Sequence, residues 1–328
     1  MRRLFLAVLA ALTFLSIALS AAAHEVRPAF LRVSETTAGE FNVVWKQPVL
    51  SGRRLKIKPS FPAGCTQSEP RLDRSRDTVA ERFTVICDLR QGILSLPGLE
   101  NTLTDAFVEI RYLDEEPRST LLKPANPSLN LSGPTASPAK EYLRIGVDHI
   151  IFGWDHLLFV IGLTLLVGGR KVWGVATAFT LAHSITLAAT ALGGAALPSR
   201  PVEILIAGSI VLLGVEVLRK QRGEKTLGAR RPYLIAFVIG LIHGFGFAGA
   251  LADIGLPTGT ELVALLLFNL GVELGQFVVI ALALSVLWAV TKLGQSWRKG
   301  LETVAVYSFA SVAMFWVIQR TLPYALGV

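Results

Sequence analysis

Hydrophobic and polar positions divide the chain into two parts with different periods. From residue 24 to about residue 124, apolar residues alternate with polar ones in short runs, among them 29–33, 41–45, 54–58, 82–87 and 106–112, with Gly, Pro, Asn and Asp between the runs. A period of two, bounded by turn residues, is typical of β-strands. The pattern predicts a small β-sandwich as a β-rich domain over residues 24–125.

After residue 140 the apolar residues form long uninterrupted runs. Six of these runs, at 143–168, 172–193, 201–218, 232–252, 261–290 and 302–319, are each long enough to cross about 30 Å of hydrocarbon as a helix. Between the two parts, residues 126–140 are rich in Pro, Ser, Gly and Thr and predict a linker. The expected fold class is a polytopic α-helical membrane protein, with a six-helix transmembrane domain over residues 141–328.

The first 23 residues have the three parts of a secretory signal. Two arginines precede an apolar run over residues 4–19, and small residues follow up to Ala23, which predicts a signal peptide over residues 1–23. An uncleaved anchor helix is the alternative. Both place the β-rich domain outside the cytoplasm, so we expect a multi-pass protein of the bacterial inner (plasma) membrane with a periplasmic or extracellular amino-terminal domain.

Composition and charge agree with this topology. The chain is 52% hydrophobic and 17% charged, and its net charge is +8. In the predicted membrane part, the inward loops contain Arg170, Lys171, Arg219, Lys220, Arg222, Lys225, Arg230, Arg231, Lys292, Arg298 and Lys299, whereas the outward segments contain only Arg200 and Arg320. This asymmetry follows the positive-inside rule. The basic charge is therefore topological, and we expect the lipid bilayer, and no nucleic acid, as a partner.

Both cysteines of the chain, Cys65 and Cys87, lie in the β-rich domain. In an oxidising compartment two such cysteines predict one disulfide. A cysteine-based metal site is therefore not expected.

Titratable residues gather at the beginning of the first apolar run. Asp148 and His149 are followed seven residues later by Asp155 and His156. Ionisable groups at membrane depth cost roughly 2.5 kcal/mol or more each, so they usually serve a function. On one continuous helix the two histidines would share a face about 10.5 Å apart along the axis. We therefore expect a ladder that holds a cation in successive positions, and not one site that uses both imidazoles together.

Later runs add His183, His243 and Glu273. Imidazole and carboxylate together suit divalent first-row metals such as Ni, Co, Zn or Fe, whereas the sulfur ligands that Cu(I) favours are nearly absent. A lone polar residue in a membrane helix often only bonds to a neighbouring helix. That interpretation stays open for Thr180, Ser184, Asn269 and Gln276. His24 would be the first residue after cleavage, and its amine and ring nitrogen could chelate a metal together. A structural or accidental role for His24 is the favoured interpretation.

Four stretches resemble the HupE/UreJ family of membrane proteins. They are His149-x5-Asp155-His156, the run 178–184, the glycine-rich run 240–248 and the run 267–276, and the resemblance covers most of residues 142–320. It implies a secondary nickel or cobalt permease, often described as a hydrogenase or urease accessory protein, in which His149, Asp155 and His156 are functional. Metalloenzyme-maturation partners are part of the same implication. This chain departs from compact members of the family in its long outward domain and in having the single histidine His243 in the glycine-rich run.

The expected function is passage of a divalent transition metal, nickel or cobalt first and zinc or iron next, with no permanently bound cofactor and no enzymatic activity. Asp148 and His149 would meet the ion near the outer face, and the deeper site would contain Asp155, His156, His183, His243 and Glu273. Because ligands bind a metal when deprotonated, uptake should depend on pH. Two alternatives stay open: a metal-dependent intramembrane hydrolase, in which zinc activates water, and a metal-sensing or partner-docking protein. The pattern makes no prediction of the oligomeric state.

Overall fold

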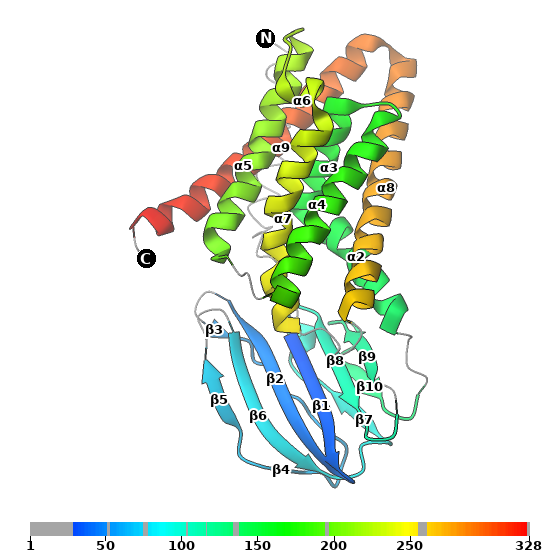
Figure 1. The fold of residues 1–328 in the computed structure, drawn as a ribbon, viewed down its shortest axis with the longest axis vertical. Coiled ribbons are helices and arrows are strands. Elements are labelled where there is room, and N and C mark those ends of the chain that lie inside the picture. Colours follow the sequence, from blue (N-terminus) through cyan, green and yellow to red (C-terminus); the bar gives the residue numbers. More distant parts are fainter. Residues whose placement is uncertain are drawn as a thin grey trace. The chain divides into compact units, whose positions relative to one another are not determined.

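The computed structural model describes residues 29–50, 53–74, 78–102, 104–115, 117–133, 138–193, 197–254 and 261–326 (Figure 1). The chain divides into a β-rich unit, mainly His24–Tyr142, and a helical unit made of Leu143–Gly249 and Leu265–Val328. The predicted signal peptide and His24 lie outside the described residues. Each unit is described by itself.

The β-rich unit contains one large mixed sheet and one small sheet. The strands are β1 (Ala29–Thr37), β2 (Glu40–Leu50), β3 (Arg53–Arg54), β4 (Thr66–Gln67), β5 (Arg71–Arg74), β6 (Thr78–Ile86), β7 (Ile93–Ser95), β8 (Ala106–Arg111), β9 (Arg118–Leu122) and β10 (Ser128–Asn130), with a short 3-10 helix at Leu99–Asn101. The large sheet has the order β4-β6-β2-β1-β8-β9, with β3 on β2 and β5 on β6. Within it β1 and β8 run parallel, and β7 pairs with β10 in the small sheet.

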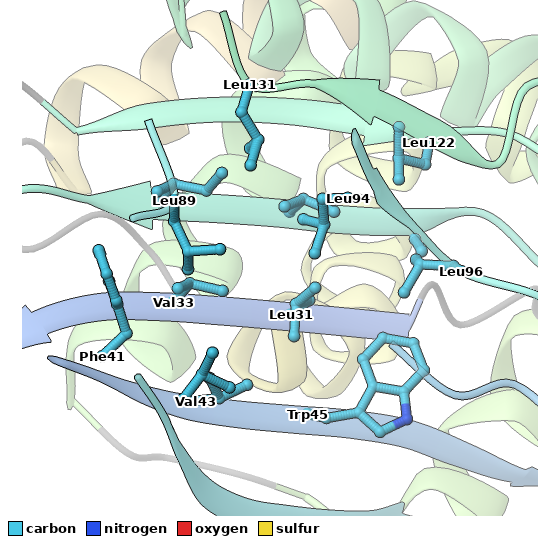
Figure 2. Packing of buried hydrophobic residues seen from close by; sticks show 14 of the residues in the cluster. Leu31, Val33, Phe41, Val43, Trp45, Leu89, Leu94, Leu96, Leu122 and Leu131 are labelled. Atoms are coloured by element: carbon cyan, nitrogen blue, oxygen red, sulfur yellow. The ribbon is translucent and has the colours of Figure 1, made fainter. Parts of the chain in front are cut away.

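Alternation along the strands builds the core of this unit. In β1, Leu31 lies opposite Trp45 and Val33 opposite Val43, and these four side chains are buried on one face of the large sheet (Figure 2). Leu94 of the small sheet belongs to the same cluster. The predicted β-rich domain is therefore confirmed. Its second layer, however, is a two-stranded sheet with loops instead of a sheet of equal size.

Two predicted segments differ from what the structure contains. Only Arg53–Arg54 of the run near residues 54–58 pairs as a strand, although Leu55 and Ile57 still contact the core. The alternation of apolar and polar residues in this run therefore reflects which side chains are buried, and the run does not continue as a paired strand. In the expected linker, Ser128–Asn130 is strand β10, because Leu129 and Leu131 pack into the same core.

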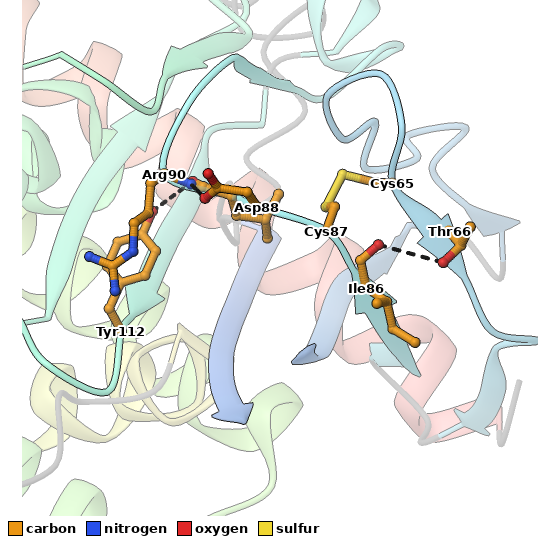
Figure 3. Close-up of a disulfide and its surroundings, with 8 residues drawn as sticks. Cys65, Thr66, Ile86, Cys87, Asp88, Arg90 and Tyr112 are labelled. Carbon is orange, nitrogen blue, oxygen red and sulfur yellow. Dashed lines mark hydrogen bonds between the residues drawn. A yellow bond between two sulfur atoms is a disulfide. The ribbon is translucent and has the colours of Figure 1, made fainter. Parts of the chain in front are cut away.

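The predicted disulfide joins Cys65 to Cys87 (Figure 3). Nearby, the Arg90 guanidinium lies 4.9 Å from the centre of the Tyr112 ring, and the Tyr112 hydroxyl donates a hydrogen bond to the Leu89 carbonyl at 2.8 Å. Burial raises the pKa of Tyr112 above its ordinary value. The hydrogen bond from Arg90 lowers the pKa of Asp114.

The helical unit is built from α2 (Pro138–Phe152), α3 (Trp154–Val167), α4 (Lys171–Gly193), α5 (Ser199–Gln221), α6 (Leu227–Arg230), α7 (Pro232–Ile254), α8 (Glu261–Leu293) and α9 (Gln295–Leu326) (Figure 1). Of the helices within the described ranges, α4, α5, α8 and α9 are long and apolar enough to cross a membrane, and the pair α2 and α3 would make a fifth crossing if counted as one span. The described apolar part of α7, Pro232–Gly246, is shorter. Four or five of the six predicted spans thus correspond to described helices that could cross a membrane.

The first predicted span is broken at Gly153. Helices α2 and α3 meet there at 71°. The Gly153 N–H donates to the His149 carbonyl at 3.0 Å, while the extended backbone of Gly153, with φ −77° and ψ 97°, ends the helical path before Trp154. A β-carbon at this position would lie 2.3 Å from the His149 carbonyl oxygen, so the close approach requires glycine.

Glycines also set the contacts between helices. A β-carbon on Gly240 would lie 2.4 Å from the Phe179 carbonyl oxygen, and one on Gly244 would lie 2.4 Å from the His183 carbonyl oxygen. Helices α4 and α7 therefore approach backbone to backbone, as small residues four apart permit in membrane helices. Gly146 of α2 and Gly271 of α8 make a second crossing of this kind, with their α-carbons close together.

Candidate metal centre

Four histidines from four helices meet inside the helical unit. We call His149 of α2, His156 of α3, His183 of α4 and His243 of α7 the His cluster. The ring centre of His156 lies 4.4 Å from that of His149, 5.1 Å from that of His243 and 6.1 Å from that of His183. One ligand nitrogen from each of His149, His156 and His183 lies within 4.8 Å of the others. His156 is therefore the centre of the group.

The expected ladder of two imidazole layers is wrong. Its spacing assumed one continuous helix, whereas the break at Gly153 turns α3 by 71° relative to α2. The turn folds His156 back towards His149 until their ring centres are only 4.4 Å apart. The two imidazoles therefore lie side by side and are close enough to bind one ion together.

Aromatic rings surround the His cluster. Phe179 lies 5.2 Å and Phe159 5.3 Å from the ring centre of His243, and Phe268 lies 5.5 Å from that of His149. His183 and His243 are fully buried, and His156 is 3% exposed. Electrostatic interactions are strong in such a low-dielectric shell, and a polar atom without a partner is costly there. Within the described residues, Nε2 of His183 and Nδ1 of His243 have no hydrogen-bond partner.

Hydrogen bonds determine which nitrogen of His156 and of His183 carries the proton. Nδ1 of His156 lies 2.9 Å from a carboxylate oxygen of Asp155, which also accepts the His156 backbone N–H. Because that oxygen accepts, Nδ1 carries the proton and Nε2 keeps its lone pair. Nδ1 of His183 lies 3.4 Å from Oδ1 of Asn269, whose amide nitrogen donates to the Leu265 carbonyl at 2.8 Å. The lone pair of His183 is therefore also on Nε2.

His243 has the opposite tautomer. The Ser209 hydroxyl donates its only hydrogen to the Ile206 carbonyl at 2.6 Å, so it accepts from Nε2 of His243 at 3.2 Å. The lone pair of His243 consequently lies on Nδ1. Ser209 was not predicted from the sequence, because a single serine in an apolar run gives no signal that separates it from other polar residues of membrane helices.

The remaining predicted site residues have different surroundings. Asp155 contacts the His cluster through Nδ1 of His156. Asp148 lies 3.8 Å from Arg144 of the same helix. The carboxylate of Glu273 accepts a hydrogen bond from the Thr177 hydroxyl at 2.6 Å. Neither Asp148 nor Glu273 belongs to the group of described residues whose ligand atoms lie within 4.8 Å of one another.

Glu273 instead belongs to a row of polar pairs between α4 and α8, which we call the α4–α8 seam. The row begins with His183 and Asn269, continues with Thr180 and Gln276 at 3.0 Å, and includes Thr177 and Glu273. Asn269 and Gln276 are buried, whereas Glu273 is half-buried. For Thr180, Asn269 and Gln276 the sequence left helix bonding open, and the structure contains these bonds.

A comparison with known protein families matches the part of the chain that contains the site. A sequence model of the HupE / UreJ protein family matches residues 126–320, a stretch that contains the whole His cluster and the α4–α8 seam. Comparison with curated proteins and with solved structures gave no match. The matched residues are more than half of the 328 in the chain. The chain therefore belongs to the HupE/UreJ family.

Proposed function

We propose that this protein carries a divalent transition-metal ion, nickel or cobalt, across the bacterial inner membrane through its helical unit. The observation that carries the proposal is the set of three histidine nitrogens, from His149, His156 and His183, within 4.8 Å of one another inside apolar helices. Neutral imidazole is a ligand that nickel and cobalt accept readily. In the proposal the metal is the transported substrate, and the protein is a transporter instead of an enzyme.

The protonation pattern supports metal binding. His156 and His183 each have Nδ1 held by an oxygen, from Asp155 and Asn269 respectively. An outer carboxylate or amide that fixes the tautomer in this way is a common feature of histidine-metal sites. Asp155 then orients His156 and adds a negative charge beside the cation, and direct ligation falls to the imidazoles. His243 is a neighbour that can take the ion from His156.

The α4–α8 seam supplies a route for the ion away from the His cluster. Glu273 is the only charged residue of α8 between Glu261 and Lys292. A carboxylate so deep in an apolar span is costly and usually lies on an ion pathway. Thr177, its partner, lies six residues before His183 in α4, which is about 9 Å along the helix axis. We propose that the ion passes from the imidazole of His183 to the carboxylate of Glu273, which Thr177 holds.

The proposed topology has six crossings. The pair α2 and α3 is taken as one crossing, followed by α4, α5, α7, α8 and α9. The loops after α3, after α5 and after α8 contain the basic residues, which favours a cytoplasmic position for them. The disulfide favours an oxidising compartment for the β-rich unit. With six crossings, the three basic loops follow the first, third and fifth crossings, so all three lie on the side of the membrane opposite to the amino-terminal unit.

Uptake of metal into proteoliposomes tests the proposal. The intact chain would be reconstituted, and Ni, Co, Zn and Fe compared as substrates. We expect selective flux of nickel or cobalt, and a loss of more than tenfold in the double variant His156→Ala with His183→Ala, since even outer-shell changes at metal sites cost tenfold or more. Ser285→Ala in α8 is the control, because Ser285 is exposed and its hydroxyl donates to the Ala281 carbonyl of its own helix, and it should keep most of the flux. Unchanged flux in the double variant would contradict the proposal.

The exchange rate of the bound ion separates transport from hydrolysis. A carrier must release its ion, so radioactive metal on the protein should exchange with free metal on the timescale of uptake. A hydrolase would retain zinc with an open position for water. Tightly held zinc that does not exchange, together with no flux of any metal, would favour the enzyme.

A further inference from the structure

A cleft opens in the helical unit where α3, α5 and α8 end and α9 begins. Its volume is about 1200 Å³. Six basic residues line it: Arg170, Lys171, Lys220, Arg222, Arg298 and Lys299. Glu302 is the single acidic residue of the lining within the described part of the chain. The cleft therefore has a strong excess of positive charge and is separate from the His cluster.

Contacts inside the protein use only part of this charge. Nζ of Lys220 donates to the carbonyl of Leu166 at 2.5 Å, at the carboxyl end of α3. Arg298 donates to Glu302 at 2.9 Å, so the one acid of the lining is already paired. The other four basic residues of the lining are exposed. Their charge is accessible to an anion from outside the protein.

The lining of the cleft also contains apolar side chains. Among them are Leu284, Leu287 and Trp288 of α8 and Val217 of α5. Trp288 is 66% exposed, and Lys292 extends over its ring with Nζ 5.0 Å from the ring centre. Exposed tryptophan beside lysine is typical of the depth at which lipid headgroups meet acyl chains. The lining thus combines basic residues that suit an anion with apolar residues that suit hydrocarbon.

We propose that this cleft binds an anionic phospholipid of the inner leaflet, with its phosphate among the basic residues and its upper acyl chain against the apolar residues of α8. Basic pockets between membrane helices on the cytoplasmic side recognise anionic headgroups in this way. A soluble phosphate would use the charge and leave the apolar residues in water. The same charge repels a divalent cation, so an exit for metal is not expected there. This proposal rests on the proposed topology but not on metal transport.

Native mass spectrometry of the intact protein in detergent tests the proposal. The protein would be titrated with phosphatidylglycerol and with phosphatidylcholine of identical acyl chains, and with glycerol phosphate as a soluble competitor. We expect tighter binding of phosphatidylglycerol and little competition by glycerol phosphate. The double variant Arg222→Gln with Lys299→Gln removes two of the exposed basic residues, and it should weaken phosphatidylglycerol binding roughly 30-fold.

The matched control is Arg230→Gln with Arg231→Gln. These residues belong to the same inward segments, are exposed, and are not part of the cleft lining. This control should bind phosphatidylglycerol within about twofold of the parent protein. Equal affinity for the two lipids would overturn the proposal, as would equal losses in the two double variants, which would indicate general surface attraction. Effective competition by glycerol phosphate would replace the lipid with a soluble anion.

Discussion

Single hydrogen bonds determine the chemistry of the His cluster at the scale of the residue. Asp155, Asn269 and Ser209 each hold one nitrogen of one imidazole, at 2.9, 3.4 and 3.2 Å. The other nitrogen of each ring keeps its lone pair. Helix packing alone would need neither the carboxylate nor a fixed tautomer on each ring. The arrangement therefore leaves one nitrogen lone pair on each ring, as the proposed metal binding requires.

Asn269→Leu removes the acceptor of Nδ1 of His183 while keeping the side-chain size. We expect cobalt affinity to fall between ten- and 100-fold, the usual cost of losing an outer-shell partner. Equilibrium titration of the purified protein with cobalt, followed by visible absorption, measures this loss. Gln276→Leu is the matched control, because Gln276 lies on the same stripe of α8 but bonds to Thr180. Equal losses in both variants would point to general damage of α8.

Tyr112→Phe tests the electrostatics of the β-rich unit. The lost hydrogen bond to Leu89 should lower the free energy of unfolding by about 1 kcal/mol. Because burial raises the folded pKa of Tyr112 above its ordinary value of 10.0, its contribution is complete below that pH and is lost as pH rises through the folded pKa. The variant should therefore lose less stability than the parent at alkaline pH. Thermal unfolding followed at the β-sheet infrared band measures the stability of the parent and of the variant at neutral and at alkaline pH. If both proteins lost the same stability at alkaline pH, the assignment of this loss to Tyr112 would be contradicted.

At the scale of the element, a break and a close crossing build the site. The break at Gly153 folds α3 against α2, and Gly240 and Gly244 bring α7 onto α4 beside His183 and His243. Both depend on the absence of a side chain at a point of backbone contact. The helices and the cluster are therefore coupled, and a change in helix spacing should be visible in metal binding.

Gly244→Ala tests this coupling. The new methyl group would lie 2.0 Å from the Thr186 hydroxyl and 2.4 Å from the His183 carbonyl oxygen, so α7 must move away from α4. We expect a loss of stability of about 1–3 kcal/mol, as for other overpacked interiors, together with weaker cobalt binding. Gly208→Ala in α5 is the control, because nothing lies within 4 Å of its new methyl group. Thermal unfolding in detergent and cobalt titration distinguish the two variants.

Glu273→Gln tests the α4–α8 seam. The amide can still meet the Thr177 hydroxyl but has no charge to receive a cation. We expect flux to fall by more than tenfold, while cobalt affinity at the His cluster stays within about twofold. Glu273→Asp, which keeps the charge, should recover part of the flux. A loss of cobalt affinity equal to the loss of flux would place Glu273 in the histidine site itself.

At the scale of the whole molecule, the chain combines a β-rich unit and a helical unit with separate sources of stability. The β-rich unit has a core of alternating side chains and a disulfide. The helical unit relies on glycine contacts and on hydrogen bonds within apolar helices. We therefore expect changes in one unit to leave the chemistry of the other intact.

Loss of the disulfide tests this independence. The bridge closes a separation of 22 residues, so Cys65→Ser with Cys87→Ser should lower the free energy of unfolding of the β-rich unit by about 3 kcal/mol. Cobalt binding by the helical unit should not change. Infrared unfolding of the sheet and cobalt titration on the same sample check both halves, and a parallel loss of cobalt affinity would show that the units are coupled.

The sequence by itself determined the division of the molecule and the chemical types in its site. Period-two alternation predicted β1, β2, β6 and β8, long apolar runs predicted α4, α5, α8 and α9, and two cysteines in one domain left a single disulfide. The histidines of the site were predicted individually, because charged or titratable residues stand out in apolar helices. These features are local, since periodicity and composition report which side of an element is buried.

Only the tertiary structure decided how these residues meet. A glycine in an apolar run predicts neither a break nor its angle. The predicted distance between His149 and His156 was wrong because it assumed a straight helix, whereas the helices meet at 71°. The partners of His183 and Glu273 are 86 and 96 residues away in sequence. The residue that fixes His243, Ser209, is on another helix. Such pairings depend on the spacing and rotation of neighbouring helices, which packing across the bundle sets and no local pattern encodes.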